Sequence, residues 1–154
     1  MMKNFNEFLI MEGADHKLSG VVLIYNNKIL LVRPKKFRSK MKKWSIPKGH
    51  IEEKLGKIET ALQELEEESR IELTKKHLKD AEKFVLNYNK AGKDKKLTCF
   101  IVRVTKEDMN IRLFNNMILG NFLKAETSEA GFFEKKDAEK IIEKHQIELL
   151  KFLK

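Results

Sequence analysis

The chain has 154 residues, of which 42% are hydrophobic and 36% are charged, and its 32 Lys or Arg against 23 Asp or Glu give a net charge of +9. Its length and apolar content fit one folded domain and exclude a globally disordered chain, and no apolar run reaches the ~20 residues that a membrane-spanning helix requires. The positive charge favours polyanionic ligands such as nucleotides, polyphosphates or nucleic acid, although a general excess of lysine explains it equally well.

Two features predict a cytoplasmic location with no membrane association. The single cysteine, Cys99, has no partner for an internal disulfide, as is usual in a reducing compartment. Residues 1–17 have a short apolar patch flanked by acids, and they lack the basic region and longer apolar stretch of a signal peptide. Zinc is not indicated, because His16, His77 and His145 form no sequence cluster with Cys or Asp.

The first half of the chain predicts a β-hairpin, a loop and a helix. Residues 18–25 and 28–33 are apolar runs separated by a polar Asn-Asn-Lys turn, which is a hairpin pattern. Residues 34–50 have no periodicity and are expected to form a loop. A helix is expected over about 57–69, where apolar residues recur at helical spacing.

The second half predicts another hairpin and a terminal helix. Residues 83–89 and 97–104 are expected to be strands joined by a polar loop at 90–96, and residues 105–131 predict mainly loop with a candidate strand in the stretch MNIRLF. An amphipathic helix is expected from about Asp137, which can cap it. Strands in hairpins and helices far apart in sequence indicate the α+β class rather than a βαβ array.

The helix predicted over 57–69 has three distinct faces on a helical wheel. Its apolar arc, which is expected to pack on the sheet, consists of Ile58, Ala61, Leu62 and Leu65. A second arc beside it holds Glu64, Glu67 and Glu68, because their spacing of three and four residues places the carboxylates together. The remaining polar residues, Glu59, Gln63 and Glu66, are expected to face water.

Convergent carboxylates repel one another, and like charges four residues apart mildly destabilise a helix. A bound divalent cation would remove that conflict, and oxygen ligands suit hard cations such as Mg²⁺, Ca²⁺ or Mn²⁺. The alternative is an acidic, solvated helix face with no ligand. The Pro-Lys-Gly-His turn before the helix favours a site, because its glycine allows the main chain to approach a ligand closely.

The segment from Gly49 to Ile71 resembles the box G-x5-E-x7-R-E-U-x-E-E-x-G-U of the Nudix (MutT-like) hydrolases, where U is a large aliphatic residue. The positions that match are Gly49, Glu64, Leu65, Glu67, Glu68 and Ile71. The resemblance extends over most of the chain from about Leu18, and it implies an α/β/α sandwich with a mixed β-sheet between helices. It divides the chain into an N-terminal segment of unknown role, 1–17, and a single Nudix domain, 18–154, with the box at 49–71.

Three box positions differ from the family pattern. The first Glu of the box is Leu55, the Arg is Gln63, and the late Gly is Arg70. In the family, that Glu and that Arg typically form an ion pair. Because this chain lacks both, neither charge is left without its partner. Arg70 is expected to distort the end of the helix, because glycine at that point commonly adopts a positive φ that costs arginine free energy.

The resemblance implies divalent-metal-dependent hydrolysis of a nucleoside diphosphate linked to another moiety, with Mg²⁺ or Mn²⁺ as the cofactor. The implied metal ligands are Glu64, Glu67, Glu68 and a main-chain carbonyl at Lys48 or Gly49. Either Glu64 or Glu68 would also orient or deprotonate the attacking water. Phosphoryl transfer suits such a site, because it depends on positioning and charge neutralisation.

Some family members take a general base from a loop before the last helix, and Glu126 and Glu129 are candidates for that role. The alternative is that both are solvated surface residues.

The basic run RPKKFRSKMKK, residues 33–43, leads into the turn and would form a cationic rim around the acidic site. The candidate substrate-binding residues are Arg33, Lys35, Arg38, Lys43, Trp44, Lys48, Gly49, His50 and Tyr88. The alternatives are a solvated loop for the lysines and core packing for Trp44 and Tyr88.

The Pro-Lys-Gly-His turn resembles the diadenosine polyphosphate hydrolase branch of the family, so diadenosine tetraphosphate or another nucleoside polyphosphate is the leading predicted substrate. The turn also resembles that of diphosphoinositol-polyphosphate hydrolases and RNA 5′-end hydrolases. One alternative is a pyrophosphohydrolase or decapping enzyme that acts on RNA 5′ ends, which the positive charge favours. A second is a catalytically weak nucleotide-binding module, which the three box differences favour. The sequence leaves open whether the protein is a monomer or a homodimer.

Overall fold

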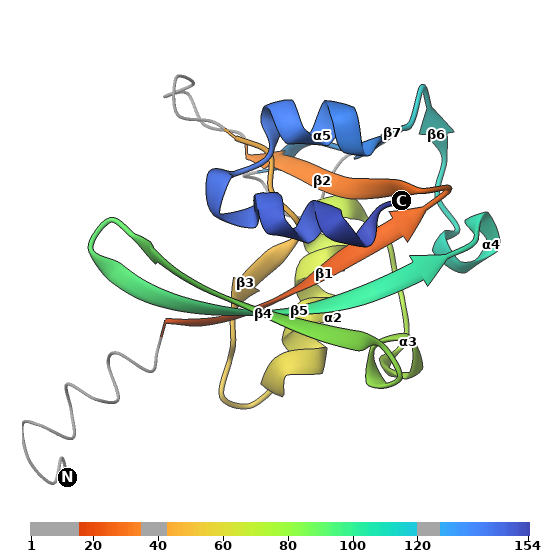
Figure 1. Cartoon of the computed structure of the whole chain (residues 1–154). Helices are drawn as coiled ribbons and strands as arrows, with labels where there is room; N and C mark the ends of the chain where they lie inside the picture. Colours follow the sequence, from red (N-terminus) through yellow and green to blue (C-terminus); the bar gives the residue numbers. More distant parts are fainter. Residues whose placement is uncertain (1–15, 35–42, 120–126) are drawn as a thin grey trace, which may run out of the picture.

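The structure, a computed structural model, describes residues 16–34, 43–119 and 127–154. Its strands form one sheet in the order β4-β5-β1-β2-β8-β7-β6, with β3 beside β1 (Figure 1). Their bounds are β1 (Lys17–Tyr25), β2 (Lys28–Pro34), β3 (Lys48–His50), β4 (Glu82–Lys90), β5 (Lys93–Val104), β6 (Leu113–Phe114), β7 (Met117–Ile118) and β8 (Thr127–Phe133). The sheet is mixed, since β1 and β5 are parallel and the other pairs are antiparallel.

Helices cover both faces of this sheet (Figure 1). They are α2 (Gly56–Ser69), α3 (Lys75–Lys79), α4 (Lys106–Met109), α5 (Lys135–Ile141) and the 3₁₀ helix η2 (Lys144–Phe152). The helix α2 lies on one face, whereas α5 and η2 lie on the other. The predicted α+β class and α/β/α sandwich are therefore confirmed. Within the three described ranges, no helix has both the length and the apolar character needed to cross a membrane.

The central strand β1 contributes side chains to two separate cores, because successive side chains of a strand point to opposite faces. Val22 packs with the residues beneath α5 and η2, including Leu149. Val21 and Leu23 pack with the residues beneath α2, including Leu65. All five side chains have no exposed surface, and burying each contributes about 2 kcal/mol. The sheet is therefore anchored firmly on both sides of the strand that carries β3.

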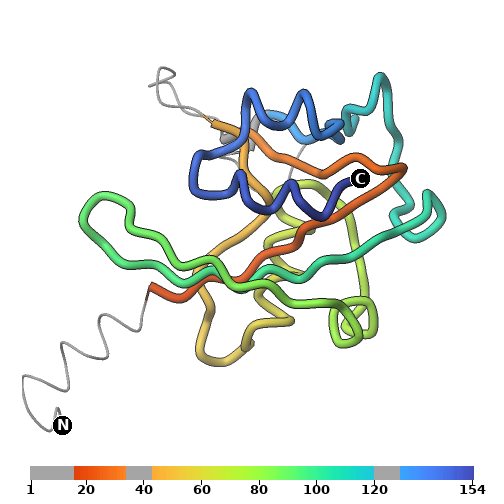
Figure 2. The backbone as a smooth tube through the Cα atoms, viewed as in Figure 1, coloured from red at the N-terminus to blue at the C-terminus, as the bar shows by residue number. Residues whose placement is uncertain are grey.

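The long β4–β5 hairpin extends from the edge of the sheet, and the carboxy terminus returns to the β1–β2 turn (Figure 2). There Asn27 Oδ1 accepts a hydrogen bond from the Lys154 N–H at 3.0 Å, and Asn27 Nδ2 donates to the Lys154 carbonyl at 3.2 Å. Strand β5 begins at Lys93, so the hairpin loop is only Ala91 and Gly92 and is shorter than the predicted 90–96. The terminal segment is thus fixed against the central strands.

Three local predictions were wrong. Residues 127–131, expected in a loop, belong to β8. They lack the alternating hydrophobic pattern of a strand, and they form one because they pair with β2. Residues 48–50, also expected in a loop, form β3 by pairing with β1. The terminal helix begins at Lys135 after the N-cap residue Glu134, so Asp137 lies in its first turn and does not cap it, and the chain continues after Ile141 as η2.

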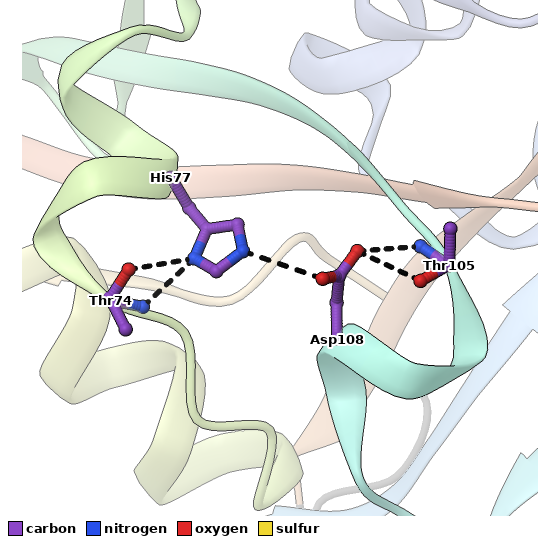
Figure 3. A network of polar contacts seen from close by, with 4 residues as sticks. All are labelled: Thr74, His77, Thr105 and Asp108. Atoms are coloured by element: carbon purple, nitrogen blue, oxygen red, sulfur yellow. Dashed lines mark hydrogen bonds and ion pairs between the residues drawn. The ribbon is translucent and has the colours of Figure 1, made fainter.

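The short helices α3 and α4, which the sequence did not indicate, are linked through their first turns (Figure 3). His77 Nδ1 accepts a hydrogen bond from the Thr74 N–H at 3.1 Å, while its Nε2 faces Asp108 Oδ1 at 3.7 Å. Asp108 Oδ2 accepts from the Thr105 N–H at 2.9 Å and from the Thr105 hydroxyl at 3.0 Å. These hydrogen bonds lower the pKa of Asp108, and the charge of His77 adds to the effect.

Candidate active site

The site is built where helix α2 packs against strand β3. The Lys48 N–H donates a hydrogen bond to Glu68 Oε2 at 3.2 Å. Gly49 faces Glu64 so closely that a Cβ at this position would overlap the Glu64 carboxylate. Two of the three predicted carboxylates therefore adjoin the main chain of the predicted turn, at the point where glycine is required for close approach.

Helix α2 holds these carboxylates in place through the apolar face beside them. Ala61 and Leu65 are buried in the core beneath α2, and Ile58 and Leu62 are partly buried against it, as predicted for this face. Ser19 Oγ on β1 donates to the Lys57 carbonyl at 2.7 Å and fixes the first turn to the sheet. The glutamates at the edge of this face are thus positioned by core packing.

Glu66 lies on the side of α2 that faces away from β3, and it interacts with Glu72. A side-chain hydrogen bond with Glu72 raises the pKa of Glu66, and the negative charges of Glu72 and Glu67 raise it further. Glu67, the third predicted ligand, lies one position before Glu68 and beside Glu66. The structure therefore brings Glu64 and Glu68 to β3 while Glu67 neighbours the outer acidic pair.

The three box differences leave the helix intact. Arg70 adopts the left-handed conformation with φ of 70°, and its N–H donates to the Glu66 carbonyl at 2.8 Å. The expected distortion of the helix end is absent there, because Arg70 takes the αL conformation that glycine would take. Leu55 is half-buried before the helix, and Gln63 is exposed.

Two carboxylates lie against the Lys48–Gly49 main chain. Carboxylate and main-chain carbonyl oxygens are the type of ligand that a hard divalent cation prefers. Across residues 16–34, 43–119 and 127–154, no three His, Cys, Asp or Glu side chains are gathered closely enough to hold a metal ion. Glu64, Glu67, Glu68 and the Lys48 carbonyl therefore stay predicted ligands.

The side chain of Lys48 lies on the other face of the sheet from Glu64. Lys48 pairs in register with Gly20, which in turn pairs with Cys99, so the three residues share the face beneath η2. Burial lowers the pKa of Lys48, and the charge of Glu68 opposes that shift. Burial also raises the pKa of Cys99 to about 12, so its thiol stays protonated.

An aromatic pair and further cations lie next to Lys48. Tyr88 on β4 stacks on His145 of η2, with ring centroids 3.9 Å apart and an interplanar angle of 17°. Burial lowers the pKa of His145, the charge of Glu143 raises it, and the positive charges of Lys48, Lys90 and Lys95 lower it again. His145 therefore lies close to three lysines and one glutamate on this face.

Glu143 partly balances these cations. Its carboxylate lies 3.8 Å from Lys90 Nζ and 3.9 Å from His145 Nδ1. Beside this group, a surface pocket of about 580 Å³ opens along the half of the β4–β5 hairpin nearer its loop. Its lining residues are His16, Lys17, Asn87, Tyr88, Asn89, Asp94, Lys95 and Lys96. The pocket carries more positive than negative charge, and Asp94 already accepts a hydrogen bond from Asn89 at 3.0 Å.

The remaining predicted residues do not form one group. Arg33 forms an ion pair with Glu129, and its guanidinium lies 5.8 Å from the centre of the Trp44 ring. Trp44 packs edge-to-face on Phe133 at 4.9 Å, as the core-packing alternative expected. Lys43 and His50 are exposed. Lys35, Arg38 and Glu126 lie outside the described residues.

Sequence reasoning missed Lys90, Lys95, Glu143 and His145. The two lysines fall in what was expected to be a loop, whereas β4 and β5 continue through them and place both on the face of Tyr88. Extending both predicted strands toward the turn would have revealed them. Lys90 lies two residues after Tyr88, so both point to the same face, and Lys95 pairs with Tyr88. No local pattern points to Glu143 and His145, which reach the site through the packing of η2.

Comparison with known proteins gives a consistent result. The family model of the NUDIX domain matches residues 15–153. A C. elegans Ap4A hydrolase in a binary complex has a TM-score of 0.65 and 24% identity, with 88% of this chain and 92% of that chain covered. The E. coli ORF135 protein has a TM-score of 0.59 and 19% identity, with 90% and 89% covered.

A third similar structure is a bifunctional NMN adenylyltransferase/ADP ribose pyrophosphatase from Francisella tularensis, complexed with AMP and a Mn ion. Its TM-score is 0.64 and its identity 18%, with 94% of this chain and 45% of that chain covered. At these identities, the solved structures show a shared fold.

Proposed function

Because the chain belongs to the Nudix family of hydrolases, which act on phosphoric anhydride bonds and generally use divalent metal ions, we propose that it is a Mg²⁺- or Mn²⁺-dependent pyrophosphohydrolase of a nucleoside polyphosphate, acting through the domain 18–154. Diadenosine tetraphosphate is the leading candidate substrate. The observation that carries the proposal is the arrangement around β3, where Glu64 and Glu68 lie on one side of the strand and the Lys48 side chain on the other.

The cationic face supports a substrate with several phosphates. Lys48, Lys90 and Lys95 all act on the pKa of His145, so their charges converge on one neighbourhood. A chain of phosphates that ends at the carboxylate side of β3 can run past these cations, which would offset its charge. The structural similarity to the C. elegans Ap4A hydrolase agrees with this choice of substrate.

The Tyr88–His145 stack supports recognition of a nucleoside. Its two rings are parallel and partly buried beside the cations, and flat aromatic surfaces of this kind are suited to stacking against a base. Since each ring already covers one face of the other, a base would stack on an outer face of the pair.

In this proposal the residues of the chain have separate tasks. A divalent ion, when bound, would neutralise phosphate charge and make a coordinated water more acidic. The carboxylates of Glu64, Glu67 and Glu68 and the Lys48 carbonyl would hold that ion. Glu64 or Glu68 would accept the proton of the water whose oxygen attacks phosphorus as the anhydride P–O bond breaks. The ion pair with Arg33 holds Glu129, which makes Glu129 a weaker candidate for the base.

A second candidate function is hydrolysis at RNA 5′ ends, and one observation favours it. Lys17 and Lys96 are register partners on neighbouring strands and both line the pocket beside the site. Like charges placed side by side destabilise a sheet, and a longer polyanion crossing both strands would relieve that repulsion.

The test is a substrate panel with purified protein and Mg²⁺ or Mn²⁺. The panel includes diadenosine polyphosphates, dNTPs, ADP-ribose, NADH, diphosphoinositol polyphosphates, and triphosphorylated or capped short RNA, with products separated by chromatography. Glu68→Gln removes the negative charge of one proposed ligand. Glu66→Gln is the matched control, because it makes the same change at a glutamate that interacts with Glu72 and not with β3.

We expect metal-dependent cleavage of diadenosine tetraphosphate that falls at least ~100-fold in Glu68→Gln and is retained in Glu66→Gln. Cleavage of RNA alone would replace the proposed substrate with the second candidate. Tight binding of one compound without turnover would instead support a catalytically weak binding module.

A further inference from the structure

The short strap of residues 44–47, which leads into β3, is fixed from both sides by main-chain hydrogen bonds. Ser45 exchanges two bonds with Val32 of β2, at 2.9 and 2.8 Å. Trp44 exchanges two bonds with the junction of α5 and η2, at 3.0 and 2.8 Å. The strap therefore lies between the sheet and the C-terminal segment.

One amide of the strap depends on a side chain. The Ile46 N–H donates to Gln146 Oε1 at 2.9 Å, and Gln146 Nε2 donates to Ser45 Oγ at 2.9 Å. Ile46 and Gln146 both have no exposed surface. Since water cannot replace a buried partner, removal of the Gln146 amide would leave the Ile46 N–H unsatisfied. Gln146 thus joins η2 to the strap through its complete amide group.

We infer that Gln146 is a positioning residue for the Lys48–Gly49 turn, an inference that rests on the proposed function. Lys48 follows Ile46 by two residues, and its N–H reaches Glu68 while Gly49 faces Glu64. A displacement of the strap therefore changes the separation between the β3 main chain and both carboxylates. Binding sites of this kind must be held to within about 0.5 Å of their working geometry.

The simpler alternative is that Gln146 only stabilises the fold. In that case its loss would lower the melting temperature but leave the site of the folded protein unchanged. The two interpretations differ in what happens at β3 at a temperature where the variant is fully folded, so the test must include a readout at the turn itself.

The variant is Gln146→Met, which keeps the length of the side chain but removes its hydrogen-bonding amide. The matched control is Leu149→Ala, which also alters a buried residue of η2 in the same core but removes no hydrogen-bonding group. In the metal-free proteins, amide hydrogen exchange of Lys48 is followed by NMR. Mn²⁺ is then titrated into each protein, and kcat and KM are measured on the substrate found in the panel.

In Gln146→Met we expect faster exchange at Lys48, Mn²⁺ affinity about 10-fold lower, and a fall in kcat that exceeds the change in KM. Leu149→Ala should keep the wild-type values when folded. If Gln146→Met does not fold, Ser45→Ala tests the same contact by removing the hydroxyl that accepts from Gln146 Nε2 and donates to the Ile46 carbonyl. A smaller loss of Mn²⁺ affinity is then expected, because the bond from the Ile46 N–H to Gln146 stays.

The inference is overturned if Gln146→Met, or Ser45→Ala in its place, matches the wild type in Lys48 exchange and Mn²⁺ affinity. It is also overturned if Leu149→Ala loses as much of both. A wild-type protein that neither binds Mn²⁺ nor cleaves any substrate would remove the proposed function together with this inference. A fully active wild type with an unaffected variant would remove this inference alone.

Discussion

At the scale of single residues, the end of α2 shows how the chain accommodates an unusual side chain. Arg70 has a φ of 70°, a region in which any Cβ costs roughly 1–2 kcal/mol. We therefore expect Arg70→Gly to raise the free energy of unfolding by about 1 kcal/mol, which corresponds to a melting temperature about 2–4 °C higher.

The control for this change is Arg70→Ala, which removes the same guanidinium but keeps the Cβ. Thermal and denaturant unfolding of both variants separates the two contributions. If the alanine variant gained as much stability as the glycine variant, the cause would lie in the guanidinium and not in the backbone.

Gly49 presents the opposite case, because its missing Cβ makes room for Glu64. In Gly49→Ala, the flexible Glu64 side chain can move aside, so we expect little loss of stability but a Mn²⁺ affinity at least ~10-fold lower. Calorimetric titration with Mn²⁺, together with thermal unfolding, measures both quantities. A variant that binds Mn²⁺ like the wild type would show that the position of Glu64 is not needed for the ion.

At the scale of elements, the link between α3 and α4 (Figure 3) gives a pH-dependent prediction. Hydrogen bonds from Thr105 lower the pKa of Asp108 below its usual 3.8. The folded protein therefore binds this proton less tightly than the unfolded chain, so the stabilisation is present above pH 3.8 and is lost as the pH falls through the lowered pKa.

Asp108→Asn should accordingly lower the melting temperature at pH 7, and the difference from the wild type should shrink below pH 3.8. The control is Glu107→Gln, which removes a negative charge from the same short helix without touching His77 or Thr105. A difference that stayed constant from pH 7 down to about pH 3 would assign the effect to packing instead of charge.

The elements also show what a sequence can predict. The hairpin of β1 and β2, the faces of α2 and the approach of Glu64 and Glu68 to the turn follow from periodicity, spacing and the resemblance to the Nudix box. Strand β8 could not be predicted, because the polar stretch Thr-Ser-Glu forms a strand only through its pairing with β2. The contacts of Gln146 and His145 depend on how η2 packs, which no local pattern in the sequence specifies.

At the scale of the whole molecule, the net charge of +9 is distributed unevenly. The glutamates of α2 lie on one side of β3, and the lysines that act on His145 lie on the other. A local field of this kind attracts an anionic substrate more effectively than net charge alone, because exposed charges more than about 8 Å apart are largely screened at physiological salt. The position of the lysines should therefore matter more than their number.

Two double variants separate the effect of local charge from that of net charge. The double variant Lys90→Gln/Lys95→Gln lowers the net charge by two at the site, and Lys135→Gln/Lys136→Gln lowers it by two on the exposed first turn of α5. We expect the first variant to raise KM for diadenosine tetraphosphate about tenfold, or ~1.4 kcal/mol, with kcat little changed. The second should leave both constants near the wild type.

The dependence on salt then identifies the kind of substrate that these lysines serve. A single-stranded RNA that neutralises three lysines should give a slope of about −2 in log kcat/KM against log salt concentration. A small dinucleotide has no extended counterion atmosphere, so its slope should be shallower, and Lys90→Gln/Lys95→Gln should flatten it further. If RNA gave both the steeper slope and the higher kcat/KM at physiological salt, the lysines would serve a polymer and the second candidate function would replace the first.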